Sequence, residues 1–512
     1  LGAMHPLLFI SRFFTRHPGK RSPIFVQRPG GGPHAPPSGM RHMNEGHQPL
    51  PDREDQRGCV QRYEAMLHRN DRLFFDVEEF ELIIDHYLEQ NDTRQAKEVL
   101  DLAQEQHPGS LDIMFSEAIV LMNMGRLNKA LEVLDAIGKL EPYNEEVHLH
   151  KASIYSQLRN YRRAIEHYKR ALELAEEGTD DILLDLAFEY ENIEAWEQAV
   201  DCLKRGLEIN AENEAVLYEL AYVMDVMDAH QQAVAFFKRF TNEHPYSFVA
   251  WFNLGNALSR MERYDESNEA LDFCLAIDDK FSSAYFSKAR NLLLTGDYER
   301  AIDCYQETLT NDGPQAITFS YIGECYEKME RFEQALIHYD QALALDTNWV
   351  DAWIGRGVVK DLQGNLPAAL KDLETALKLA PDHGDAWFYY ANALGRALRY
   401  DDALAAYTRL NTLEPESLDG WLDHADLLMN LKSADAALKK LREGEQVHKL
   451  NARYRYRMVS YLLRTGMEQQ AFLELEEALM ADHAAHTQLL EHYPEAAVMP
   501  QVIHLLELYK QP

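Results

Sequence analysis

Apolar and small residues recur along this chain with the spacing of paired helices. Between residues 248 and 260, one helical face with the spacing i, i+3, i+4, i+7 is formed by Trp251, Leu254, Gly255 and Leu258. A series of small residues repeats every 34 positions, with a single step of 35. Its members are Ala96, Ala130, Ala164, Ala199, Ala233, Ser267, Ala301, Ala335, Ala369, Ala403, Ala437 and Ala471. A period of this length predicts an array of helical repeats.

Each repeat is predicted to hold two helices separated by a short break. Glycine in segments such as Met124-Gly125-Arg126 permits the backbone angles that end a first helix. Proline follows the second helix at one phase, because it removes a helical hydrogen-bond donor, at Pro108, Pro142, Pro245, Pro381 and Pro415. We therefore expect an all-α array of about twelve helix-turn-helix units, which begin near residues 77, 111, 145, 180, 214, 248, 282, 316, 350, 384, 418 and 452.

The segments outside the array differ in composition. Residues 1–50 are rich in Pro, Gly, His and Arg and are predicted to form a disordered basic tail. Because the chain opens on Leu1 with Met40 and Met43 downstream, two interpretations stay open for residues 1–43, a native segment or a fusion or untranslated stretch. Residues 51–76 are predicted to be a leading capping helix, residues 77–480 the solenoid, and residues 481–512 the C-terminal capping helices.

Two units carry the residues most typical of a known family. One holds Trp251, Leu254, Gly255, Tyr264 and Leu271, and another holds Trp387, Ala391, Leu394, Ala403, Tyr407 and Pro415. At these positions the chain resembles the tetratricopeptide repeat over roughly residues 77–480, as a stand-alone array of bacterial type without an appended catalytic domain. The resemblance implies a right-handed α-solenoid with a concave groove, lined by first helices, that holds a peptide or a partner protein.

Composition narrows the class of partner and the compartment. The net charge is -33, and residues 1–44 hold six bases and no acid, so the acidity lies in the rest of the chain and disfavours nucleic acid. No apolar run approaches the length that a membrane span needs, so membrane insertion is not expected. The five cysteines are odd in number and include no C-x-x-C, which indicates a reducing, cytoplasmic location. The oligomeric state is left open.

Positions 2, 5, 9, 12 and 13 of a first helix point away from its buried stripe, where a ligand would lie. In the units from 248 and 282 these positions, together with position 6, carry no carboxylate. Amides can bind a peptide backbone, arginine can bind a carboxylate, and rigid aromatic rings give contact area. The predicted peptide-binding residues are Tyr218, Tyr222, Phe252, Asn253, Asn256, Phe286 and Arg290, with a secondary locus at Phe388, Tyr389, Asn392 and Arg396. The alternative, that these residues only contact neighbouring helices, stays open.

Acids occupy the equivalent positions on either side of this region. The earlier units carry Glu78, Glu81, Asp85, Asp112, Glu146, Asp181, Glu191 and Asp225, and the later ones carry Glu324, Glu327, Asp351, Asp361, Asp385, Asp419 and Asp426. We expect these acidic limbs to favour a ligand with basic flanking segments.

The sequence therefore predicts a protein-binding scaffold. A regulatory or co-chaperone-like peptide-sensing module is the alternative, although the positions where that resemblance implies a lysine and asparagine pair hold Glu81 and Asp85, which would repel an acidic tail. An enzyme is a distant third, because no phosphate-binding, nucleophile-elbow or zinc-protease motif occurs, and no cofactor is expected. The nearest approach to a metal cluster, His483, His486 and His492, is interpreted as surface histidines.

Overall fold

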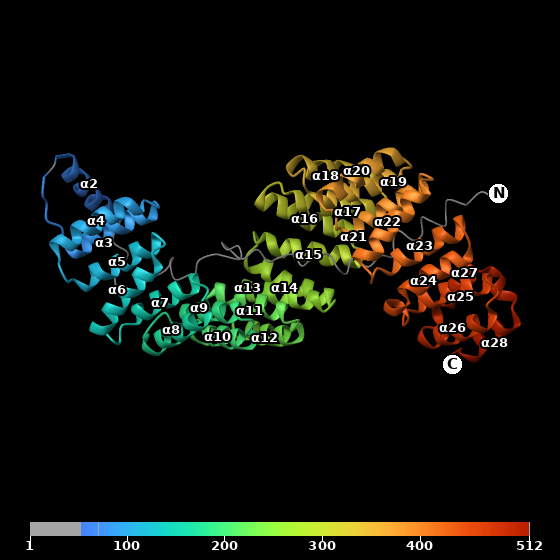
Figure 1. Ribbon diagram of the computed structural model, residues 1–512, viewed down its shortest axis with the longest axis horizontal. Coiled ribbons are helices and arrows are strands. Elements are labelled where there is room, and N and C mark those ends of the chain that lie inside the picture. The colour runs from blue at the N-terminus through green and yellow to red at the C-terminus, as the bar shows by residue number, and fades with distance from the viewer. Residues whose placement is uncertain (1–52, 70, 511–512) are drawn as a thin grey trace. The chain divides into compact units, whose positions relative to one another are not determined.

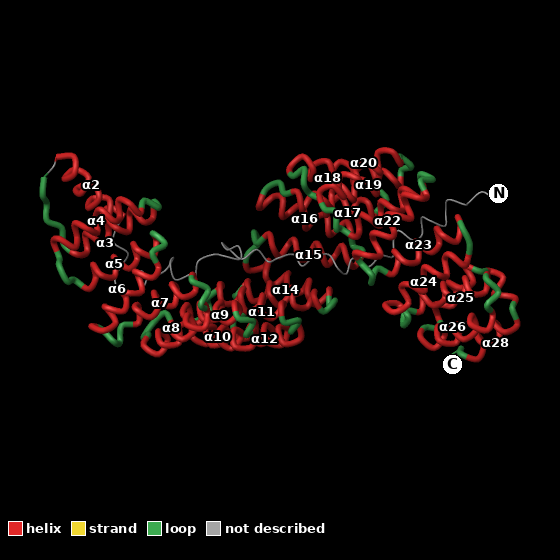
Figure 2. Tube along the Cα trace, in the orientation of Figure 1, coloured by secondary structure: helices red, strands yellow, loops and turns green. Residues whose placement is uncertain are grey.

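A computed structural model describes residues 53–69 and 71–510 of the chain. The predicted tail, residues 1–50, lies outside the described residues. Over the described ranges every regular element is a helix, joined to the next by a short loop, and no strand occurs there (Figure 2). The chain divides into two compact units, with the boundary between Asp279 and Lys280.

The N-terminal unit, as far as it is described, consists of one leading helix and six helix pairs (Figure 1). The two helices of a pair pack together, and the second packs on the first helix of the next pair. The helices are α2 (Arg53–Arg69), α3 (Val77–Glu89), α4 (Thr93–Gln106), α5 (Leu111–Asn123), α6 (Leu127–Leu140), α7 (Glu145–Gln157), α8 (Tyr161–Leu174), α9 (Thr179–Asn192), α10 (Trp196–Ile209), α11 (Glu214–Val226), α12 (His230–Glu243), α13 (Phe248–Arg260) and α14 (Tyr264–Ile277).

The described part of the C-terminal unit repeats the plan and adds a terminal group that packs on α25 and α26. Its helices are α15 (Ser282–Thr295), α16 (Tyr298–Asp312), α17 (Ala316–Lys328), α18 (Phe332–Leu345), α19 (Val350–Leu362), α20 (Leu366–Leu379), α21 (Gly384–Arg396), α22 (Tyr400–Leu413), α23 (Leu418–Leu431), α24 (Ala434–His448), α25 (Ala452–Arg464), α26 (Glu468–Ala481), η2 (Ala484–His486), α27 (Thr487–His492), η3 (Pro494–Val498) and α28 (Pro500–Leu508). The prediction of an all-α solenoid of helix-turn-helix repeats is confirmed.

Small residues let the two helices of a pair approach closely. All members of the 34-residue series are at most 4% exposed. In α13, a Cβ added to Gly255 would lie 2.8 Å from Leu271 Cγ of α14, closer than real Cβ atoms come. The one serine of the series uses this proximity, because Ser267 Oγ donates a hydrogen bond of 2.6 Å to the carbonyl oxygen of Gly255. The small side chains therefore set the separation within each pair.

The break within a pair uses one residue with a positive φ. Four repeats place glycine there, at Gly125, Gly296, Gly364 and Gly466. Seven others place a residue with a side chain, namely Asn91, Arg159, Glu194, Asp228, Glu262, Glu330 and Leu398. Only the glycines are visible as breakers in the sequence, because glycine alone adopts this conformation without a steric cost.

A tryptophan at the fourth position of a first helix fixes the loop before that helix. Its indole Nε1 donates to the carbonyl oxygen six residues earlier, at 2.8–2.9 Å, in Trp251, Trp353, Trp387 and Trp421. Three of these carbonyls belong to the recurring prolines Pro245, Pro381 and Pro415. The ring supplies an apolar surface for packing, and the indole N–H bonds the loop carbonyl. One tryptophan therefore contributes both to packing and to the conformation of the preceding loop.

We expect Gly355→Ala to destabilise the C-terminal unit by about 1–3 kcal/mol, the usual effect of overpacking. A Cβ at Gly355 in α19 would lie 2.3 Å from Tyr339 Cζ of α18, and Tyr339 is only 2% exposed. Gly395→Ala in α21 is the control, because nothing lies within 4 Å of its Cβ position. Urea unfolding would measure both, and a Gly355→Ala midpoint equal to that of the control would contradict the proposed fit.

Candidate functional site

The predicted peptide-binding residues fall in both compact units. Tyr218 and Tyr222 lie on α11 and Phe252, Asn253 and Asn256 on α13, all in the N-terminal unit. Phe286 and Arg290 lie on α15, which belongs to the C-terminal unit. The structure therefore presents two separate sets of residues, each described within its own unit.

In the N-terminal unit, the aromatic residues form one surface and the two asparagines have different roles. The Tyr218 ring meets the Phe252 ring edge to face, with centroids 6.5 Å apart. Phe252 is only 4% exposed, whereas Tyr218 and Tyr222 are partly exposed. Asn256 is partly exposed as well, and its amide forms no hydrogen bond within the described residues.

Asn253 is a structural residue rather than an exposed contact. Its side chain is 3% exposed, and Nδ2 donates to the carbonyl oxygen of Leu217 at 3.0 Å. The prediction treated position 6 of the first helix as exposed, but that position faces the preceding first helix. The amide therefore joins α13 to α11.

In the C-terminal unit, Phe286 is part of an aromatic cluster. Its ring meets those of Tyr305 and Tyr321 edge to face, with ring centroids 5.4 and 5.5 Å apart. Arg290, one turn further along α15, is partly exposed and forms no ion pair among the described residues. Tyr305 is buried, and its hydroxyl has no hydrogen-bond partner in the described part of the chain.

The predicted secondary locus serves mainly to join helices. Asn392 is 6% exposed and its Oδ1 accepts a hydrogen bond of 2.6 Å from the Tyr407 hydroxyl. Arg396 Nε donates to Asp361 Oδ1 at 3.1 Å, and Phe388 is 9% exposed. Tyr389 remains partly exposed. The Arg396 guanidinium and the Asn392 amide, which suggested a ligand, therefore bind other side chains of the same unit.

A surface of successive first helices remains on the N-terminal unit. Several neighbouring first helices of this unit pack on each other, as α3 does on α5 and α11 on α13. We name as the first-helix face the side chains at the outward positions of these helices, Glu78, Glu81, Asp85, Asp112, Phe115, Ile119, Glu146, Leu149, Asp181, Tyr218, Tyr222, Phe252 and Asn256. Aromatic residues occupy its α11 and α13 end, and acids occupy its α3, α5 and α7 end.

The acids at the α3, α5 and α7 end raise one another's pKa. Burial, followed by the Asp112, Asp85, Glu78 and Glu146 carboxylates, raises the pKa of Glu81 to about 7. Burial and the nearby Glu89 raise the pKa of Asp85 to about 6. Desolvation and repulsion therefore both disfavour the ionised form of these carboxyl groups.

The later acids differ, because the chain pairs most of them. Asp361 is paired with Arg396, Asp419 with Arg453 at 3.1 Å, and Asp426 with Arg457. Asp351 lies 3.7 Å from His383, and Glu327 accepts a hydrogen bond from Tyr339. In the later limb, arginines from the following repeat therefore neutralise the charge of Asp361, Asp419 and Asp426, which are not available to a ligand as the prediction had them.

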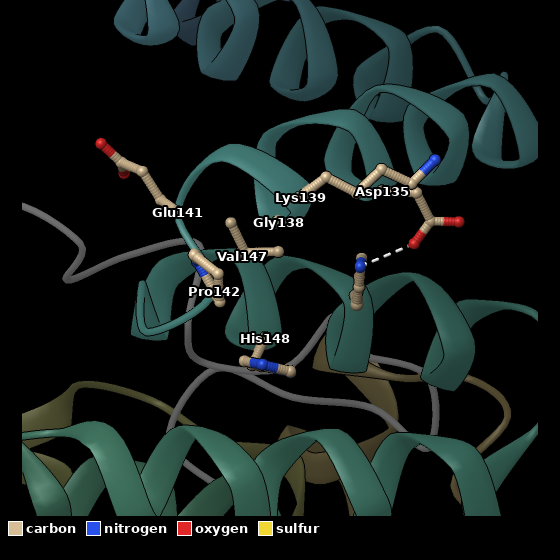
Figure 3. A pocket seen from close by; sticks show the side chains of 8 residues that line it. Asp135, Gly138, Lys139, Glu141, Pro142, Val147 and His148 are labelled. Carbon is tan, nitrogen blue, oxygen red and sulfur yellow. Dashed lines mark ion pairs between the residues drawn. The ribbon is translucent and has the colours of Figure 1, made fainter.

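A small cavity between α6 and α7 lacks the arrangement of an active site (Figure 3). It has a volume of about 300 Å³ and is lined by Asp135, Gly138, Lys139, Glu141, Pro142, Val147, His148 and Lys151. Lys151 Nζ is bound to Asp135 Oδ1 at 2.6 Å, as the dashed line in Figure 3 marks. His148 Nδ1 lies 3.0 Å from His167 Nδ1, so one ring must donate to the other. Asp135, Lys151 and His148 thus each already have a polar partner within the chain.

The terminal histidines take part in packing. His483 Nε2 lies 3.0 Å from the carbonyl oxygen of Leu506, His486 Nδ1 lies 2.7 Å from that of His483, and His492 contacts the buried Arg457 guanidinium. Over the described ranges, no group of three or more His, Cys, Asp or Glu side chains is placed to hold a metal ion. Likewise, none of the described helices combines the length and apolar character required to cross a bilayer.

Comparison with known families identifies the repeat. Family models described as tetratricopeptide repeat match residues 87–154, 145–177, 252–316, 316–349 and 361–417. The matched segments lie in both compact units.

The relatives are distant. The chain is 21% identical over 281 residues, 55% of its length, to the tetratricopeptide repeat-containing protein trd-1 of Caenorhabditis elegans, of which this covers 33%. It is 22% identical over 261 residues, 51% of its length, to anaphase-promoting complex subunit 3 of Schizosaccharomyces pombe, of which 39% is covered. Among solved structures, yeast Tom70 is similar with a TM-score of 0.46 and 13% identity, covering 85% of this chain and 95% of Tom70. The chain thus spans about a third to two fifths of these curated relatives.

We expect Glu81→Gln to stabilise the protein increasingly as pH rises. The pKa of Glu81 is about 7 in the folded chain against 4.5 as the ordinary value, so the folded state binds more protons between these pH values and loses stability as pH increases through them. The melting temperature of the variant should match the wild type near pH 4 and exceed it at pH 8, by on the order of 1–2 °C. Glu208→Gln, at an exposed acid on α10, is the control. If the difference in melting temperature between Glu81→Gln and the wild type did not depend on pH, the effect could not come from the raised pKa of Glu81.

Proposed function

We propose that this chain, which belongs to the tetratricopeptide repeat family, is a non-catalytic scaffold that holds an extended segment of a partner protein on the first-helix face of its N-terminal unit. Proteins of this family are generally protein-interaction scaffolds. The proposal also places the protein in the cytoplasm, which is supported by the absence of a disulfide between any two of its five cysteines, all of which the structure describes.

The observation that supports this site most directly is the surface around Tyr218 and Asn256. Tyr218 packs against the buried Phe252 and remains partly exposed, so its ring is held in place while part of it is accessible. The Asn256 amide has both a donor and an acceptor available, which is what an extended backbone needs. A rigid aromatic ring on α11 and an unused amide on α13, one turn beyond Phe252, can bind a peptide with little loss of side-chain entropy.

Two other functions have less support. An enzyme would need convergent acid, base or nucleophilic groups, whereas Asp135, Lys151 and His148 of the α6 and α7 cavity each already have a polar partner within the chain. A co-chaperone-like module that binds an acidic tail is opposed by Glu81 and Asp85, whose pKa values are already raised by burial and neighbouring carboxylates.

The proposal is tested by selecting binders from a library of linear peptides displayed on phage, with the full chain as bait. We expect Tyr218→Ala to weaken the selected peptides about tenfold in titration calorimetry, because it removes a packed aromatic contact. Asn256→Ala should weaken them several-fold.

Tyr143→Ala and Tyr246→Ala are the matched controls. These tyrosines are 78% and 84% exposed in loops between repeats of the same unit, and neither belongs to the first-helix face. They should leave affinity unchanged. Failure to select any binder, or equal losses in Tyr218→Ala and the controls, would refute this site.

A further inference from the structure

Some acids on first helices are paired with an arginine of the next repeat. Four of them form an ion pair with an arginine 31–35 residues later, on the next first helix. Arg260 Nε lies 2.9 Å from Asp225 Oδ1 in the N-terminal unit, and three further pairs occur in the C-terminal unit, Asp361 with Arg396, Asp419 with Arg453, and Asp426 with Arg457. In these four pairs, one repeat supplies the counter-charge for the repeat before it.

The α3, α5 and α7 end of the first-helix face contains no such pair within the part of the chain that the structure describes. Glu78, Asp112 and Glu146 occupy the same repeat position, 34 residues apart, so each acid is followed by another acid rather than by an arginine. No ion pair involves these three residues, Glu81 or Asp85 among the described residues. Burial, and after it the neighbouring carboxylates, raise the pKa values of Glu81 and Glu146.

A second feature of this end is an apolar surface that includes a histidine without a partner. Phe115, Ile119 and Leu149 are partly exposed beside the acids. His150, one turn after Glu146, is 6% exposed, and its ring lies 6.2 Å from that of Phe115. Neither of its ring nitrogens forms a hydrogen bond in the described part of the chain. This buried polar group could accept a hydrogen bond from a ligand.

We propose that the α3, α5 and α7 end of the first-helix face binds a partner segment in which lysine or arginine alternates with apolar residues. The basic side chains supply the missing counter-charges to Glu81, Asp112 and Glu146, and the apolar ones pack against Phe115 and Leu149. Alternation matches an extended strand, whose side chains point to opposite sides in turn. This inference rests on the proposed function, since it names the chemistry of the partner.

A short synthetic peptide of alternating lysine and leucine tests the proposal with the full chain. We expect it to bind in titration calorimetry, to weaken as salt rises from about 50 to about 200 mM, and to outcompete both a glutamate–leucine and a lysine–serine peptide. The triple variant Glu81→Gln, Asp112→Asn, Glu146→Gln should lose about tenfold in affinity, as three exposed ion pairs worth roughly a factor of two each would give.

The matched control is the triple variant Glu132→Gln, Glu166→Gln, Glu208→Gln. These exposed acids lie on the second helices α6, α8 and α10 of the same unit, so the net charge changes equally. Asp112→Glu, which keeps the charge, should retain binding. Circular dichroism would verify that each variant is folded.

Equal losses in the two triple variants would overturn the inference, because attraction would then depend on overall charge. If the two triple variants lose affinity equally but the phage-selected peptides still require Tyr218, the proposed function stands and only the inference about the partner's chemistry fails. Residues 1–44 hold six bases and no acid. If the lysine–leucine peptide bound more tightly after their removal, this segment of the chain would itself be the occupant of the site. That result would likewise overturn the inference of a separate partner.

Discussion

The structure depends on the close approach of two helices at one small residue in every repeat. Gly255 against Leu271, with Ser267 bound to the Gly255 carbonyl, shows how little room the interface leaves. A side chain of ordinary size would separate the pair and displace the next first helix. Because each repeat packs mainly on its neighbours, this local fit determines the position of every outward residue on the first-helix face.

The sequence predicted the paired helices because small residues and breakers at a fixed period leave few alternatives. It did not show the positive φ at Leu398 or Glu262, since these residue types are not typical of that conformation. The tryptophan bonds to loop carbonyls were missed for a similar reason. The spacing places Trp251 on an apolar helical face, and only coordinates show where its indole nitrogen points.

The candidate site was harder to predict, because a residue's role depends on its partner. Asn253 and Asn256 are three residues apart, yet one is buried against Leu217 and the other has an unused amide. Acids at equivalent positions also differ, since Asp419 is paired with Arg453 while Asp112 forms no ion pair within the described residues. Helical periodicity indicates which way a side chain points, but the pairing between repeats is a three-dimensional property.

The placement of the unpaired acids has a consequence for the cooperativity of the array. In a linear stack the outermost repeats have fewer neighbours, so they open before the middle does. Repulsion between like charges on α3, α5 and α7 further destabilises this end, where α2 is the helix that packs on α3 from the N-terminal side. Any cation that settles among them would strengthen the weakest part of the stack, so occupancy would be detectable as slower amide exchange in the first three repeats.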